Sequence, residues 1–114
     1  MSKRNLLIVD DNQDERQRAA ATLRDKAGCV VLEAGSCSEA SEILATHDIT
    51  ILITTPFLPA REGFELVRRA HVSNPQIVAI AAIPDSERQL VTEALQVGVF
   101  FHVATPYDFS ELVI

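Results

Sequence analysis

The stretch LLIVDDN, residues 6–12, decides the fold that the sequence predicts. Four consecutive apolar residues indicate a short strand that is buried on both faces, as the strands of parallel sheets usually are. Asp10, Asp11 and Asn12 end this run and supply a helix cap, because their side-chain oxygens accept hydrogen bonds from the first amides of a helix. We therefore expect a strand at residues 6–9 that leads directly into a helix over about residues 13–27.

The alternation of apolar runs and helical segments continues along the whole chain. Strands are predicted at residues 6–9, 29–33, 49–54, 77–82 and 99–104. Helices are predicted after each strand, at about 13–27, from Ser36 or Ser38 onward, from Gly63 to Asn74, from Pro84 to Gly98, and from Asp108 to the end. The fifth helix is truncated, because the chain stops after about one turn. This spacing predicts one α/β domain, residues 1–114, in which right-handed crossovers join parallel strands.

The composition excludes several classes of function. The chain has 114 residues, a net charge of −6 and a pI near 4.9, which argues against nucleic-acid binding by this domain. No apolar stretch reaches the roughly 18 residues that a membrane span needs, and the first apolar run is too short for a signal peptide. Cys29 and Cys37 lack a Cys-x-x-Cys spacing, so we expect two reduced thiols in a cytoplasmic protein.

In a parallel sheet, residues that bind or react usually follow the carboxyl ends of the strands. Here these positions hold Asp10 and Asp11, Thr55, Ala81 and Thr105. The two aspartates allow two interpretations, because carboxylates at the start of a helix can cap it or can bind a cation. The residue types alone leave both interpretations open.

Four segments give the chain a wider resemblance. They are LLIVDDN (6–12), AGCVVLEAGSCSEASEIL (27–44), PFLPAREGFELVRR (56–69) with its Pro-x-x-x-Gly spacing, and ALQVGVFFHVATPYDFSEL (94–112). Over its whole length the chain resembles the receiver domains of bacterial two-component response regulators. The resemblance implies a flavodoxin-like sheet of five parallel strands in the order 2-1-3-4-5, with helices on both faces, and a regulatory role in phosphorelay signal transduction.

The resemblance also implies where a phosphorylation site would lie. Receivers hold Mg²⁺ with two acidic residues after the first strand, and these correspond to Asp10 and Asp11. Their phosphoacceptor, an aspartate four residues before a loop proline, corresponds to Thr55. Because that carboxylate is missing, we expect only weak residual Mg²⁺ binding by the acidic pair, at best in the millimolar range, and no required cofactor.

Three further positions of the receiver site depart from the family pattern. A hydroxyl residue after the fourth strand corresponds to Ala81, a lysine before a proline to Thr105, and an aromatic residue three positions earlier to His102. Without the lysine, its positive charge is not available to stabilise a transferring phosphoryl group. An ionised carboxylate attacks phosphorus without a base, whereas the hydroxyl of Thr55 needs one. We therefore expect phosphotransfer to fail at this site.

The sequence predicts a pseudo-receiver, a non-enzymatic cytoplasmic domain that regulates an output domain or a partner through protein contacts and without phosphorylation. A histidine kinase is not expected to act on it, and neither nucleic acid nor a membrane is an expected partner of this domain. Two alternatives remain open. One is an active phosphoacceptor that uses Asp10, Asp11 or Thr55, and the other is a small-ligand sensor that reuses the space left by Ala81 and Thr105.

Aromatic residues gather near the end of the chain. In receivers the fifth strand and fifth helix form much of the face for dimerisation and partner docking, so Phe100, Phe101 and Tyr107 are interface candidates. The alternative is a packing role, in which Phe101 and Val103 belong to the core, Phe100 faces a neighbouring helix and His102 is half-buried.

The short last helix leaves apolar surface near Phe109 and Leu112. We expect either further polypeptide after Ile114 or a second copy, as in a homodimer, to cover this surface.

Overall fold

The computed structural model describes residues 5–58, 62–105 and 107. Its elements follow the order β1 (Asn5–Val9), α1 (Gln13–Ala27), β2 (Val30–Ala34), α2 (Cys37–Thr46), β3 (Ile51–Thr54), α3 (Gly63–Ser73), β4 (Val78–Pro84), the 3₁₀ helix η2 (Asp85–Glu87), α4 (Leu90–Gln96) and β5 (Phe101–Thr105). The predicted fifth helix, with Phe109 and Leu112, lies outside the described residues.

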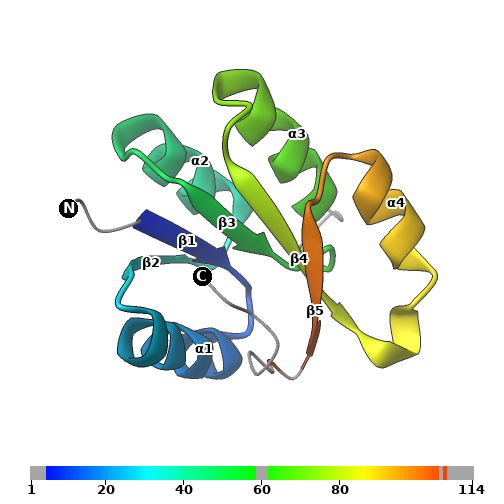
Figure 1. The fold of residues 1–114 in the computed structure, drawn as a ribbon, viewed down its shortest axis with the longest axis horizontal. Helices are drawn as coiled ribbons and strands as arrows, with labels where there is room; N and C mark the ends of the chain where they lie inside the picture. The colour runs from blue at the N-terminus through cyan, green and yellow to red at the C-terminus, as the bar shows by residue number, and fades with distance from the viewer. Residues whose placement is uncertain (1–4, 59–61, 106, 108–114) are drawn as a thin grey trace.

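The strands form one parallel sheet in the order β2-β1-β3-β4-β5, which confirms the predicted topology. Figure 1 shows α1 on one side of this sheet and α2, α3 and α4 on the other. Buried side chains of the sheet accordingly divide between two core clusters. One cluster joins the sheet to α2, α3 and α4, and the other joins it to α1.

The helix ends follow from local chemistry. The side chain of Asn12 accepts a hydrogen bond from the Glu15 amide at 3.1 Å and caps α1, and Gly28 ends that helix in the left-handed conformation at φ 64°. Ser36, not Ser38, caps α2 by accepting from the Glu39 amide at 3.2 Å. Among the described residues, none of the helices has the length and apolar character that a membrane crossing requires.

The two cysteines lie on opposite faces of the sheet. Cys37 belongs to the cluster under α2, α3 and α4, whereas Cys29 belongs to the cluster under α1. Both are buried, and no disulfide joins them. Burial and the neighbouring carboxylate of Glu62 raise the pKa of the Cys37 thiol, which favours its protonated form.

The region after β4 differs from the prediction. A helix was expected to open at Pro84, but β4 continues to Pro84, η2 follows, and α4 begins only at Leu90. Pro84 has φ −62° and ψ 147°, an extended conformation that continues the strand and pairs with Thr105. The prediction of a helix from Pro84 was therefore wrong at its start.

The packing alternative for the fifth strand was right for Val103 and wrong for Phe101 and His102. β5 is an edge strand, so only one neighbour covers it, and it begins at Phe101 instead of residue 99. Phe101 is 38% exposed and is not a core residue, whereas Val103 is buried in the cluster under α1. Phe100 is 77% exposed. His102 is exposed, although half-burial was expected. On α4, which the structure describes in full, Leu95 is 58% exposed and Ala94 is the one buried residue of the helix.

Candidate functional site

Asp10 and Thr55 lie side by side at the carboxyl edge of the sheet. Each follows a residue of the β1–β3 pair Val9↔Thr54, and the Thr55 amide donates to the Val9 carbonyl at 3.4 Å. Both side chains are buried, at 5% and 6% exposure. The structure thus brings together two of the positions that the sequence singled out.

Both carboxylate oxygens of Asp10 already have protein donors. Oδ1 accepts from the Asn12 amide at 2.9 Å, and Oδ2 accepts from the hydroxyl of Tyr107 at 2.8 Å. Hydrogen bonds to an ionised carboxylate are among the stronger ones in proteins. Protein donors therefore bond both oxygens of the buried Asp10 carboxylate. The N-cap of α1 is Asn12 and not Asp10.

Tyr107 was predicted as an interface residue, and that role stays a prediction. The structure turns this side chain inward: it is half-buried and packs against the core cluster under α1. Burial, followed by the charge and the hydrogen bond of Asp10, raises the pKa of Tyr107 above its ordinary value. The phenol therefore stays protonated and able to donate.

Asp11 does not share the environment of Asp10. Its side chain is exposed, whereas Asp10 is buried. The positive charge nearest to Asp10 among these contacts is the guanidinium of Arg16 on α1, whose Nη1 donates to the Asp10 backbone carbonyl at 2.8 Å. Arg16 Nε also forms an ion pair with Glu33 at 3.1 Å, which ties α1 to β2.

Thr55 is held by its own loop. Its Oγ1 accepts from the Phe57 amide at 3.2 Å, and its carbonyl accepts from the hydroxyl of Thr54 at 3.2 Å. The start of α3 packs directly on this turn, since a Cβ on Gly63 would meet the Thr55 carbonyl oxygen and lie 2.7 Å from the Cα of Pro56. Because a Cβ would overlap this backbone, only glycine fits at position 63.

The other three positions that the sequence singled out, Ala81, His102 and Thr105, lie at two different levels of the β4–β5 pair. Ala81 is fully buried and pairs directly with His102, which is exposed. Thr105 pairs with Pro84, three residues farther along both strands, and is half-buried. The structure therefore places Ala81 and His102 together and sets Thr105 farther out along the strands.

The residues of this edge do not fit a divalent cation well. Mg²⁺ requires about six oxygen ligands in a nearly octahedral arrangement. Asp10 is engaged on both oxygens, and Thr55 already accepts a backbone hydrogen bond. Within residues 5–58, 62–105 and 107, no group of three or more His, Cys, Asp or Glu side chains could hold a metal ion. Weak Mg²⁺ binding by Asp10 and Asp11 stays a prediction.

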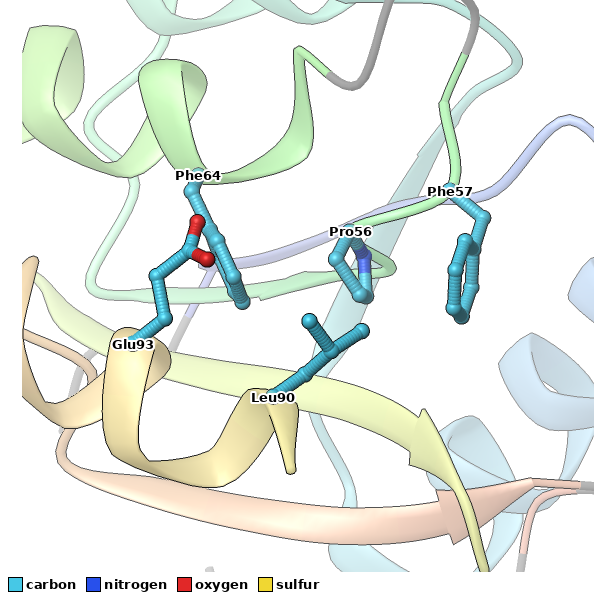
Figure 2. Close-up of a pocket in the computed structure, with 5 residues that line it drawn as sticks. All are labelled: Pro56, Phe57, Phe64, Leu90 and Glu93. Carbon is cyan, nitrogen blue, oxygen red and sulfur yellow. The ribbon is translucent and has the colours of Figure 1, made fainter. Parts of the chain in front are cut away.

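A small cavity lies beside the turn that follows Thr55. Figure 2 shows its lining, which comes from that turn, from α3 and from α4: Pro56, Phe57, Phe64, Leu90 and Glu93. Its volume of about 30 Å³ suits a water molecule and is too small for a metabolite. Neither Ala81 nor Thr105 lines it, so it is not the space that the ligand-sensor alternative requires.

Two features of this site escaped sequence reasoning. The first is the bond from Tyr107 to Asp10, and the second is the contact of Arg16 with the Asp10 carbonyl. A weak signal existed for each. Tyr107 stands two residues after Thr105, at the same sheet edge, and Arg16 stands one helical turn after the cap Asn12.

Comparison with known proteins gives consistent matches. Residues 6–114 match the family described as response regulator receiver domain. The transcriptional regulatory protein PdtaR of Mycobacterium tuberculosis is 28% identical over 111 residues, which cover 96% of this chain and 53% of PdtaR. The sporulation initiation phosphotransferase F of Bacillus subtilis is 24% identical over 112 residues, covering 98% of this chain and 90% of that protein.

The fold is similarly matched among solved structures. The signal receiver domain of an HD domain-containing protein from Pseudomonas fluorescens superposes with a TM-score of 0.87 at 24% identity, covering 97% of this chain and 89% of that one. At this identity the likeness concerns the fold alone. The chain spans about half the length of PdtaR, the curated relative described above.

Proposed function

The chain belongs to the response regulator receiver domain family, and we propose that it is a pseudo-receiver, which regulates by protein contact and does not accept a phosphoryl group. The observation that carries this proposal is the residue at the end of β3. Thr55 is buried at that position beside Asp10, and its hydroxyl oxygen accepts the Phe57 amide. An uncharged alcohol therefore stands where a receiver needs an ionised carboxylate.

The chemistry of phosphoryl transfer supports the proposal. Attack on phosphorus by a hydroxyl requires a base, and the nearby carboxylate of Asp10 is already bonded to Asn12 and Tyr107. The last residue of β5 is Thr105 and not a lysine, so that position supplies no cation to stabilise the charge of a transferring group. Ala81 offers no hydroxyl to a phosphate. The acceptor carboxylate, the lysine and the hydroxyl residue are thus missing, and the carboxylate of Asp10 is occupied.

Regulation by contact has a candidate surface. Phe100, Phe101 and Leu95 are exposed at the edge formed by α4 and β5. We propose that this surface binds a second copy or an output domain. PdtaR, of which the chain covers 53%, has room for a further domain, whereas the chain covers 90% of the sporulation initiation phosphotransferase F. No histidine kinase, nucleic acid or membrane is a proposed partner of this domain, and a cytoplasmic location is proposed.

Beryllofluoride tests the proposal, because in receivers it binds the acceptor aspartate with Mg²⁺ as a mimic of the acyl phosphate. The native chain is titrated and followed by amide chemical shifts in NMR. We expect no saturable change at residues 10, 55, 81 or 105. The matched variant carries Thr55→Asp, Ala81→Thr and Thr105→Lys, together with Tyr107→Phe to release Asp10 from the tyrosine hydroxyl, and we expect it to respond. A saturable response of the native chain at these positions would refute the proposal.

A further inference from the structure

We propose that Tyr107 takes the place of the divalent cation at Asp10, so that the tyrosine contact and a bound Mg²⁺ exclude each other. The inference deepens the proposed function and rests on it. It concerns the cation that the receiver family implies and that the residues of this edge do not fit. The contact of Tyr107 with Asp10 is the observation from which it starts.

The geometry sets the two occupants in competition for Oδ2 of Asp10. Oδ2 of Asp10 lies 2.8 Å from the Tyr107 oxygen and accepts its proton, while Oδ1 accepts the Asn12 amide. A cation that approached Oδ2 would meet the positive end of the tyrosine O–H bond. Mg²⁺ would therefore have to displace Tyr107 before it could use the buried carboxylate.

The tyrosine is well placed to resist displacement. Its ring packs against the core cluster under α1, so removing it would return apolar surface to water. Its hydroxyl would also lose a hydrogen bond to a charged acceptor. The guanidinium of Arg16, 2.8 Å from the Asp10 carbonyl, adds positive charge that disfavours a second cation.

The consequence is a fixed connection between the segment that follows β1 and the segment that follows β5. Asp10 directly follows β1, and Tyr107 lies two residues beyond β5. In this chain the acidic residue thus serves as an anchor for Tyr107 and not as a metal ligand. Tyr107 is a positioning residue, and the arrangement of the sheet edge becomes independent of Mg²⁺.

Mg²⁺ alone, without any phosphoryl donor, tests this inference. Isothermal titration calorimetry compares the native chain with Tyr107→Phe, which keeps the ring and removes the donor. We expect no saturable binding below about 10 mM in the native chain, and an affinity about tenfold or more higher in the variant, since the hydrogen bond no longer has to be broken. Adding Asp10→Asn to Tyr107→Phe should remove this gain. Equal affinities of the native chain and the variant would overturn the inference.

A second measurement needs no variant. Tyr107 is the only tyrosine and the chain has no tryptophan, so its fluorescence reports on this one site. We expect the emission of the native chain to stay constant up to about 10 mM Mg²⁺ at constant ionic strength. A saturable change at submillimolar Mg²⁺ would overturn the inference. This failure would leave the proposed function standing, because that function is judged by beryllofluoride at Thr55.

Discussion

The hydroxyl of Tyr107 donates to Oδ2 of Asp10 over 2.8 Å and joins residues 97 positions apart in the sequence. This bond connects the end of β1 with the segment after β5, on the side of the sheet that α1 covers. Because the acceptor is a buried carboxylate, the bond is expected to stabilise the fold as well as to occupy the acidic pocket.

Replacing Tyr107 by phenylalanine should lower the free energy of unfolding by about 1–3 kcal/mol, because the buried carboxylate of Asp10 loses a donor. Urea unfolding followed by circular dichroism measures this change. The same substitution in an Asp10→Asn background is the matched control, and there it should cost markedly less. Equal costs in the two backgrounds would show that the bond contributes nothing.

Stability should fall at alkaline pH because of Tyr107. Its pKa is raised in the folded protein by burial and by Asp10, while an unfolded tyrosine has a pKa of about 10. Below pH 10 both states keep the proton and the contribution is complete. Above pH 10 only the unfolded state releases it, so the free energy of unfolding decreases by up to about 1.4 kcal/mol per pH unit.

The phenolate absorbance of the single tyrosine checks this prediction directly. Phenolate should appear only together with the loss of the circular dichroism of the folded state. Ionisation near pH 10 in a chain that is still folded would contradict the burial of Tyr107 against Asp10.

Gly63 and Gly28 should differ in their tolerance of a methyl group. Gly63→Ala should cost about 3 kcal/mol or more, since its Cβ would collide with the backbone of Thr55 and Pro56. A Cβ added at Gly28 would have no atom within 4 Å, so only the left-handed φ of 64° opposes Gly28→Ala. We expect this substitution to lower the free energy of unfolding by about 1–2 kcal/mol. Thermal unfolding of both variants tests the order, and a milder effect at Gly63 would contradict the close packing of α3 on the turn.

If the chain self-associates, we expect the contact to involve the exposed edge formed by α4 and β5, which includes Phe100 and Phe101. Phe100→Asp is expected to weaken dimerisation about tenfold or more, because burial of a phenylalanine side chain is worth roughly 1.5–3 kcal/mol. Val72→Asp is the matched control, since Val72 is 87% exposed on α3. Sedimentation velocity over a concentration series gives both values. An equal effect of the two substitutions would place the contact elsewhere.

The sequence predicted those features of the fold that depend on local pattern. Continuous apolar runs located the strands, and Asn12, Gly28 and a serine at the start of α2 marked helix ends by their own hydrogen bonds and conformations. The start of α4 was missed, because Pro84 is compatible with the first turn of a helix and equally with an extended strand. Tertiary pairing with β5 decided between them.

The site was predictable only in part for a related reason. Strand ends placed Asp10 and Thr55 at one edge, because neighbouring parallel strands end together. The partner of Asp10 was not predictable, since a contact between residues 97 positions apart leaves no periodic signal. The exposure of Phe101 depended on the position of β5 at the edge of the sheet, which apolar content does not report.

Intact-mass spectrometry after incubation with acetyl phosphate and Mg²⁺ tests the central claim most directly. We expect the native chain to keep its unmodified mass, while the variant with Thr55→Asp, Ala81→Thr, Thr105→Lys and Tyr107→Phe gains one phosphoryl group in a measurable fraction. A phosphoryl group located by peptide mapping on Thr55, Asp10 or Asp11 of the native chain would contradict the claim.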